Sequence, residues 1–323
     1  MLSYRRLAVS FVVFFFAILL FAADQDAPTF TDKEAAGEVF VIQGEYEGQV
    51  GGDAWGAHVI AIGKDSFRAI GYMGGLPGKG WSGEASQYLS GKLKDSTVTM
   101  ETDDFYIEID GKALTVFDNN GGELGALKKV VRKSETLGMK PPENAIVLFD
   151  GKSTDHWIDA KLVNKQFLGA TNCYTKEKLG DHQLHIEFRT PFMPESSGQA
   201  RGNSGVYVQG RYEVQVLDSF GLEGKDNECG GIYQISKPKV NMCFPPLTWQ
   251  TYDIDFTAAK WEGDKKLKNA RITLKHNGVV IHDDLELPKH TPGREQEGPD
   301  PAALFLQNHG NPVVFRNIWV VKK

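Results

Sequence analysis

The sequence has little cysteine and no long run of basic residues. Only three of its 323 residues are cysteines, and the spacing of Cys173, Cys229 and Cys243 fits no zinc-binding pattern. The net charge is −6, and no basic stretch is long enough to indicate a nucleic-acid surface, so nucleic acid is not an expected partner. No long segment shows the period of a helix. The 35 glycines and 19 phenylalanines instead favour a turn-rich, all-β chain.

The chain begins with its one strongly apolar segment. Arg5 and Arg6 precede an apolar run from Leu7 to Phe21, and Ala22 and Ala23 are small enough for a cleavage site. The run is shorter than the roughly 20 residues that a membrane span needs. We therefore expect residues 1–23 to be a signal peptide. The mature protein would be exported to the periplasm or the cell exterior, without stable membrane insertion. An uncleaved anchor is the alternative, because Leu20 and Phe21 suit the site poorly.

An exported protein can form disulfides. Cys229 and Cys243 lie close together in the sequence, so we predict a bond between them and expect Cys173 to be a buried free thiol. Closing a loop of about 15 residues would contribute about 3 kcal/mol in the chain-entropy model.

Residues 37–133 read as short strands separated by glycine turns, with a hairpin signal at Asp110-Gly111. We predict a small β-rich domain here, without a catalytic constellation. Tyr72 or Trp81 could stack on a sugar ring, although core packing is the plainer role for them. Residues 134–143 contain Pro141-Pro142 and are predicted to be a linker.

From residue 144 onward the strands alternate apolar and polar residues. The segments 183–190 and 252–256 show this pattern, and Asn277-Gly278 is a strong hairpin signal. No helical period interrupts them. The pattern indicates an antiparallel sandwich or jelly roll made of two sheets.

The strand at residues 212–218 carries the most informative polar residues. Glu213 and Gln215 alternate with apolar neighbours, and a bulge near Leu217 would return Asp218 to their face. Two carboxylates on one sheet face suit general acid–base chemistry on a sugar. The alternative is an edge strand with a solvated polar face.

The ordered motifs of residues 144–321 resemble the 3-keto-disaccharide hydrolase domain family. The stretches that carry the resemblance are Leu148–Lys152 with Trp157, Leu184–Arg189, Gly202–Tyr207, Tyr212–Asp218, Trp249–Ile254, Ala270–His282 and Leu306–Trp319. The resemblance implies a concanavalin-A-like jelly-roll β-sandwich at residues 144–323, preceded by the small β-rich domain. The spacing of Glu213, Gln215 and Asp218 is similar to the Glu-x-Asp-x-x-Glu strand of glucanases. The two changed residues count against a glucanase mechanism.

The resemblance implies an enzyme that acts on carbohydrate and cleaves 3-keto-glycosides by elimination and hydration, a net hydrolysis. Two alternatives stay open. The domain could be a non-catalytic, lectin-like carbohydrate-binding module, because such sandwiches host both functions. It could also be an ordinary glucanase-like glycosidase.

Each candidate residue has a plainer alternative role. For catalysis the candidates are Glu213, Asp218 and His309; for substrate binding they are Gln215, Gln307, Arg316, Tyr207 and Gln209. Arg316 could instead pair with a carboxylate, and Asp218 could form a turn. The stripe of His185, Glu187 and Arg189 is more typical of a solvated, salt-bridged face. The cofactor is unknown; a divalent metal held by the carboxylates and His309 stays open, although no ligand spacing indicates it.

Overall fold

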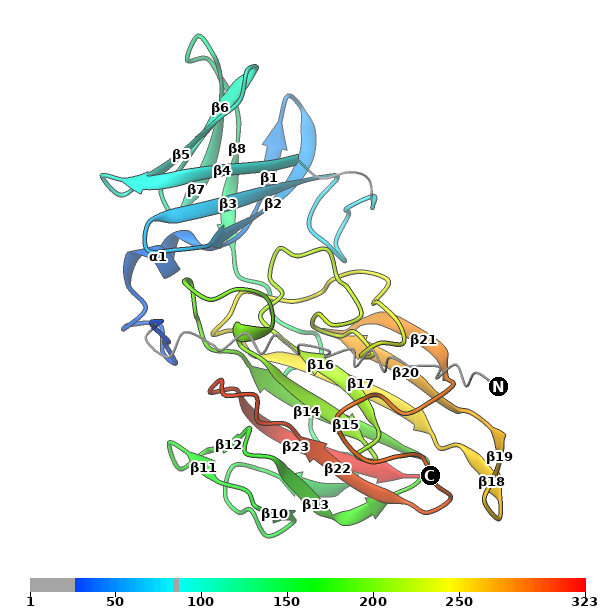
Figure 1. The fold of residues 1–323 in the computed structure, drawn as a ribbon. Coiled ribbons are helices and arrows are strands. Elements are labelled where there is room, and N and C mark those ends of the chain that lie inside the picture. Colours follow the sequence, from blue (N-terminus) through cyan, green and yellow to red (C-terminus); the bar gives the residue numbers. More distant parts are fainter. Residues whose placement is uncertain (1–26, 84–86) are drawn as a thin grey trace, which may run out of the picture.

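The computed structural model describes residues 27–83 and 87–323. Antiparallel strands form a barrel followed by a two-sheet sandwich, so the expected all-β class is confirmed (Figure 1). The predicted signal peptide, residues 1–23, lies outside the described residues. None of the helices in the described ranges has the length and apolar character that a membrane crossing requires.

The first part is a closed barrel. Each strand pairs with the next along the chain, and β8 pairs again with β1, which closes the sheet. The helix α1 (Gly37–Ile42) packs its buried Ile42 into the barrel core. The strands are β1 (Gly44–Val50), β2 (Asp53–Ala61), β3 (Ser66–Met73), β4 (Gln87–Lys94), β5 (Thr97–Glu101), β6 (Phe105–Ile109), β7 (Ala113–Asp118) and β8 (Glu123–Val130).

One sheet of the sandwich has five strands. In spatial order they are β10 (Trp157–Ile158), β13 (Cys173–Leu179), β22 (Ala302–Leu306), β15 (Ser204–Val208) and β16 (Tyr212–Val216). A short 3₁₀ helix, η1 (Gly198–Ala200), precedes β15. β16 is therefore an edge strand, and this position leaves its free side open to pairing with loops.

The second sheet has eight strands. In order they are β11 (Leu162–Val163), β12 (Phe167–Gly169), β23 (Val314–Lys322), β14 (His182–Arg189), β17 (Gln250–Thr257), β20 (Ala270–His276) and β21 (Val279–Leu287), while β9 (Ile146–Phe149) pairs with β23. A separate hairpin joins β18 (Lys260–Glu262) to β19 (Lys265–Lys268). Side chains from both sheets, such as Val214 and Ile254, form one core between them.

Both predicted hairpins are confirmed. Asp110-Gly111 turns β6 into β7, and Asn277-Gly278 turns β20 into β21. Gly111, Asn277 and Gly278 have φ angles of 82°, 52° and 87°. Glycine and asparagine adopt this left-handed region more readily than other residues, which is why these dipeptides stand at the turns.

The barrel and the sandwich share a buried contact. Ile60 and Ile70, on the outer face of the barrel, form an apolar cluster with Phe220, which follows β16. Tyr72 belongs to this cluster and is 5% exposed, and Trp81 packs against it with 5.2 Å between the ring centroids. These two rings therefore take part in interdomain packing.

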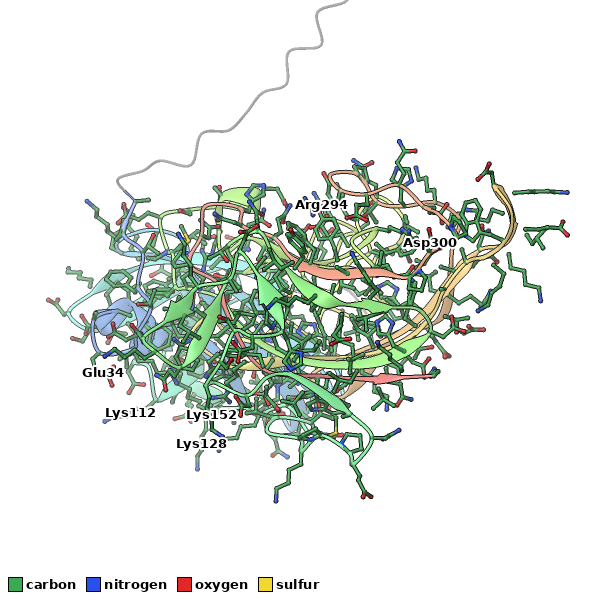
Figure 2. The ribbon with its side chains drawn as sticks, turned by 90° about the horizontal axis from the view of Figure 1, so that it is seen from below. Glu34, Lys112, Lys128, Lys152, Arg294 and Asp300 are labelled. Atoms are coloured by element: carbon green, nitrogen blue, oxygen red, sulfur yellow. The ribbon has the colours of Figure 1, made fainter. Side chains whose placement is uncertain are left out.

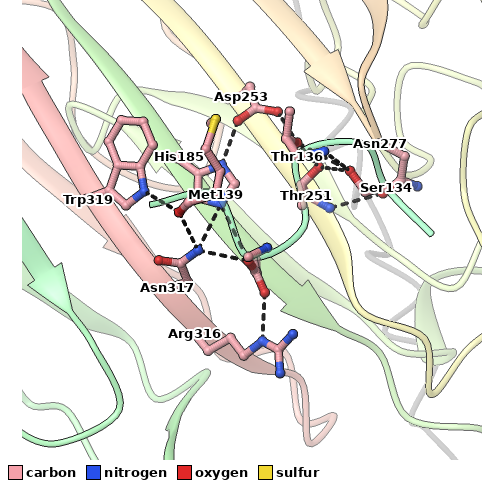
Figure 3. A network of polar contacts seen from close by, with 12 residues as sticks. Ser134, Thr136, Met139, His185, Thr251, Asp253, Asn277, Arg316, Asn317 and Trp319 are labelled. Atoms are coloured by element: carbon pink, nitrogen blue, oxygen red, sulfur yellow. Dashed lines mark hydrogen bonds and ion pairs between the residues drawn. The ribbon is translucent and has the colours of Figure 1, made fainter. Parts of the chain in front are cut away.

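The predicted linker at residues 134–143 is tied to the eight-stranded sheet. The Ser134 hydroxyl lies 2.6 Å from the Thr251 hydroxyl, and the Thr136 hydroxyl donates to Asp253 at 2.6 Å. The backbone N–H of Gly138 donates to Glu187 at 2.6 Å (Figure 3). This part of the connection is therefore held along the outer face of the sheet.

Candidate functional site

Glu213 and Tyr207 form the centre of the candidate site. They stand directly opposite each other on the neighbouring strands β16 and β15. Val206 and Val214, which alternate with them, enter the sandwich core, so Tyr207 and Glu213 leave the sheet on its other face. The Tyr207 hydroxyl donates a hydrogen bond of 2.8 Å to Oε2 of Glu213.

The Glu213 carboxyl is held where its charge is poorly solvated. The residue is 3% exposed, and no cation pairs with it in residues 27–83 or 87–323. Burial raises the pKa of Glu213 to about 7, and the hydrogen bond from Tyr207 partly opposes this rise. Burial and the nearby Glu213 charge also raise the pKa of Tyr207, so its phenol stays protonated. The site thus joins a carboxyl that titrates near neutrality to a permanent hydrogen-bond donor.

A glycine makes room for this carboxyl. Gly205 lies on β15, one pleat away from Tyr207. A Cβ atom at position 205 would stand 2.4 Å from Oε1 of Glu213 and 2.9 Å from the Tyr207 ring. Both separations are shorter than van der Waals contact, so a larger residue would displace the pair.

Two loops close over the edge strand and bury the pair. The backbone N–H of Glu213 donates to the Thr291 hydroxyl at 2.9 Å, which fixes the loop between β21 and β22. The backbone N–H of Tyr233 donates to the Glu213 carbonyl, which fixes the loop between β16 and β17. Gly293 also lies close to Tyr207, because a Cβ added there would stand 3.2 Å from the phenol oxygen.

Polar and aromatic side chains extend the site along β22. The Gln307 amide donates to the Tyr207 hydroxyl at 3.3 Å, and its Oε1 is buried without a partner among the described residues. The Phe305 ring meets Tyr207 edge-on. The Arg294 guanidinium lies 3.8 Å above the Phe305 ring, on the exposed loop that Figure 2 labels at Arg294 and Asp300. An acceptor and a cation therefore stand beside the acid–base pair.

Gln215 and Asp218 have partners other than Glu213. The Gln215 amide donates to the Asn203 side chain at 2.8 Å and to two backbone carbonyls. The Asp218 carboxylate accepts from Arg201 at 2.6 Å, and Arg201 also donates to the Ala61 carbonyl of the barrel. Leu217 and its neighbour Val216 both lie in the core, so the alternation of apolar and polar residues shifts by one residue here, as the sequence suggested. The two carboxylates therefore have different partners: Glu213 binds Tyr207, whereas Asp218 binds Arg201, which links the sandwich to the barrel.

Among the described residues, two further candidates make no hydrogen bond to Tyr207 or Glu213. Gln209 has a φ of 54° in the turn between β15 and β16, and its amide donates to the Leu179 carbonyl. His309 follows the end of β22 and is exposed. Because His309 lies beyond the end of β22, its side chain does not follow the alternation of that strand.

Arg316 belongs to the other sheet and pairs with a carboxylate there, which is the alternative role that the sequence left open for it. Arg316 pairs with Glu187 at 2.6 Å on the outer face of the eight-stranded sheet (Figure 3). Its guanidinium also stacks on the Trp249 ring. The expectation that His185 and Glu187 are solvated is wrong, because both are fully buried beneath residues 134–139. Bonds from His185, Asn317 and Arg316 hold the pKa of Glu187 near 2 despite its burial.

The predicted disulfide is absent from the structure. All three cysteines are buried free thiols. The Cys229 sulfur lies 3.2 Å from the Tyr252 hydroxyl, and the Cys243 thiol donates to the Leu217 carbonyl at 3.6 Å. The short sequence separation brings the two thiols together, as expected, but here each has a polar partner of its own.

The described residues contain no group of three or more His, Cys, Asp or Glu side chains that could hold a metal ion. The carboxylates and His309, which the sequence left open as metal ligands, do not gather there. Glu213 contacts a phenol, and Asp218 contacts a guanidinium. This donor set does not fit a divalent cation, which prefers several oxygen ligands gathered around one point.

Sequence reasoning did not select Gly205, Thr291, Arg294 or Phe305 for the site. Phe305 and Gln307 are two residues apart, so strand alternation places them on the same face. The sequence could therefore have identified Phe305 as a site residue. Thr291 and Arg294 lie in an irregular loop, which carries no periodic signal. Their contact with β16 and β22 depends on the path of that loop in space.

Comparisons with known proteins match the sandwich. The family model described as the 3-keto-alpha-glucoside-1,2-lyase-like domain matches residues 144–321. A candidate glycosyl hydrolase of solved structure, from Parabacteroides distasonis ATCC 8503, is 31% identical, with a TM-score of 0.52; the match covers 56% of this chain and 85% of that one. A search of curated proteins finds no match.

Two more candidate glycosyl hydrolases from the same organism are 17% and 20% identical, with TM-scores of 0.39 and 0.40. The matches cover 60% and 55% of this chain and 98% and 99% of those chains, but they are too weak to support an argument. The family match and the 31% identical structure indicate a glycosyl-hydrolase-like function for the sandwich. Because residues 144–321 are more than half of the chain, the protein belongs to the family of the 3-keto-alpha-glucoside-1,2-lyase-like domain.

Proposed function

We propose that this protein cleaves 3-keto-glycosides, with Glu213 as the general base and acid. The observation that carries the proposal is the buried Glu213 carboxyl, whose pKa is raised to about 7, in hydrogen-bond contact with Tyr207. A strongly shifted carboxyl without a counter-ion is typical of a catalytic site rather than of a structural ion pair.

The chemistry follows from the ketone of the substrate. A carbonyl at C3 acidifies the proton on C2, and the Glu213 carboxylate takes that proton. The electron pair of the C2–H bond forms an enolate and then expels the group at C1, which leaves a double bond between C1 and C2. The hydroxyl of a water molecule adds to C1, and the Glu213 carboxylic acid returns the proton to C2. The remaining proton of that water goes to the oxygen that left C1, so the leaving group departs as an alcohol. The sum is a hydrolysis without a covalent enzyme intermediate.

The raised pKa suits both halves of this cycle. A carboxylate whose conjugate acid has a pKa of about 7 is a stronger base than an ordinary carboxylate, yet about half of it is ionised at neutral pH. Such a group typically contributes about 10²–10⁴-fold to the rate. Tyr207 keeps its proton and holds the carboxyl in position.

The neighbours of the pair supply the remaining roles in the proposal. Arg294 provides positive charge for the enolate oxygen at C3, because its loop lies beside Tyr207. The unpartnered Oε1 of Gln307 would accept a hydrogen bond from a sugar hydroxyl. Glu213 is almost fully buried, so the loop between β21 and β22 must shift to admit the sugar.

The proposal also covers the detailed fold of the sandwich and the location of the protein. The two stacked antiparallel sheets fit a concanavalin-A-like jelly roll. The charged and apolar pattern of residues 1–23 supports export to the periplasm or the cell exterior.

The test measures product release from 3-keto-trehalose, with unoxidised trehalose as the control substrate. Glu213→Gln keeps the shape of the side chain and removes the base, so turnover should fall by more than about 10²-fold. Glu177→Gln is the matched control. It makes the same change on β13 of the same sheet, where Glu177 pairs with Lys322 near the surface. Full activity of Glu213→Gln, or a wild type that binds trehalose without cleaving 3-keto-trehalose, would contradict the proposal.

A further inference from the structure

The barrel contains a cavity that the proposed sugar chemistry does not use. It has a volume of about 230 Å³. The sandwich contributes no residue to its lining, which comes wholly from the barrel strands and their ends. The matched family domain begins at residue 144, so the family match assigns nothing to this cavity.

The barrel interior is packed at one end and hollow at the other. At the end that α1 covers, Tyr46, Val59 and Phe67 are fully buried and fill the space between the strands. Directly across from Tyr46 and Val59 on the neighbouring strands, the small residues Ala57 and Ala69 face the interior, and the space from there towards the other end stays unfilled. An eight-stranded barrel is wide enough either to be filled by side chains or to hold one small ligand. This barrel does both, at different ends.

Apart from Gln87, the described lining residues are apolar, and the cavity opens to solvent. Trp55, Leu89 and Phe105 form part of the wall and are only half buried. Leu124, at the start of β8, is 43% exposed and also faces the cavity. These residues lie near the strand ends opposite to α1, because the start of β1, which follows α1, pairs with the ends of β2 and β8. The cavity therefore opens at that side of the barrel.

We propose that this end of the barrel binds an uncharged hydrocarbon group, either an alkyl chain or a fused aromatic ring. None of the lining residues within 27–83 and 87–323 is charged, so a charged ligand group would be desolvated there without a partner from them. Apolar cavities of roughly 150 Å³ stay dry and take up molecules the size of benzene. This cavity is larger, and its aromatic wall suits a flat or flexible apolar group.

The experiment uses the full chain and the uncharged fluorescent probe N-phenyl-1-naphthylamine. We expect saturable fluorescence enhancement with one site, accompanied by quenching of tryptophan emission that Trp55→Phe reduces. Ala57→Leu fills the cavity and should weaken binding at least tenfold. Ala54→Leu is the matched control, because it makes the same change three residues away at an exposed position; its affinity should stay within twofold of wild type.

Melting temperature and circular dichroism show whether each variant folds. If Ala57→Leu does not fold, Ala69→Leu fills the same cavity from β3. 1-Decanol, an uncharged alkyl competitor, should displace the probe, whereas trehalose should not. Absence of saturable probe binding to the wild type overturns the proposal. So does equal affinity of the folded cavity-filling variant and Ala54→Leu.

Discussion

Tyr207 and Glu213 face each other across two antiparallel strands, and the phenol donates to the buried carboxylate at 2.8 Å. The Tyr207 side chain cannot neutralise the carboxylate, so the cost of burying the Glu213 charge is only partly offset. This relationship gives the site a group that titrates near pH 7 and links catalysis to stability.

Glu213→Gln should stabilise the protein at alkaline pH while removing its activity. The pKa of Glu213 rises from an ordinary 4.5 to about 7 on folding, so the folded state holds a proton that the unfolded state releases. The stabilisation that this bound proton gives to the folded state is complete below pH 4.5 and is lost as the pH rises through 7. The wild type should therefore lose about 3 kcal/mol relative to the Gln variant across this range. Urea unfolding of both proteins at pH 4.5 and 8 measures the difference. An equal change in the free energy of unfolding of the two proteins between these pH values would contradict the prediction.

Tyr207→Phe should move the pH dependence of cleavage to higher pH. In the wild type kcat/KM should rise with pH through about 7, because the base must lose its proton. The hydrogen bond from Tyr207 lowers the pKa of Glu213, so its removal should raise that pKa further. A pH–rate profile of 3-keto-trehalose cleavage measures the shift. A lower rate with an unchanged midpoint would show that Tyr207 acts in another way.

Gly205→Ala should reduce turnover by displacing the carboxyl. The added Cβ would stand 2.4 Å from Oε1 of Glu213, closer than atoms can approach. Gly180→Ala is the control, because a Cβ at that position meets nothing within 4 Å. Comparison of kcat for the two variants, with melting temperatures to confirm folding, separates a local effect from general damage. Equal kcat values would count against the crowding argument.

Asp218→Asn should destabilise the protein rather than act on the chemical step. Its carboxylate forms a buried ion pair with Arg201, which also bonds the barrel at Ala61. Breaking a buried pair from one side costs about 3–5 kcal/mol, because the other charge stays buried. Asp284→Asn is the control, since its pair with Arg271 is exposed and should hardly affect stability. Denaturant unfolding tests this, and a loss of kcat at unchanged stability would return Asp218 to a catalytic role.

The local pattern of the sequence determined much of this protein. Alternation placed Glu213 on the face away from the core, and it placed Phe305 with Gln307. Asp110-Gly111 and Asn277-Gly278 marked hairpins, because few other residues adopt positive φ angles easily. The ordered motifs from Leu148 to Trp319 identified the family that the comparison then confirmed.

Tertiary structure alone decided how those residues act. The sequence did not show that loops around Thr291 and Tyr233 would cover Glu213, or that Arg316 would lie on the other sheet beside Glu187. It also did not show that residues 44–130 close into a barrel with a hollow end. The alternation of apolar and polar residues predicts on which face of the sheet a side chain lies. Desolvation, and with it the pKa of Glu213, depends on what distant segments place above that face.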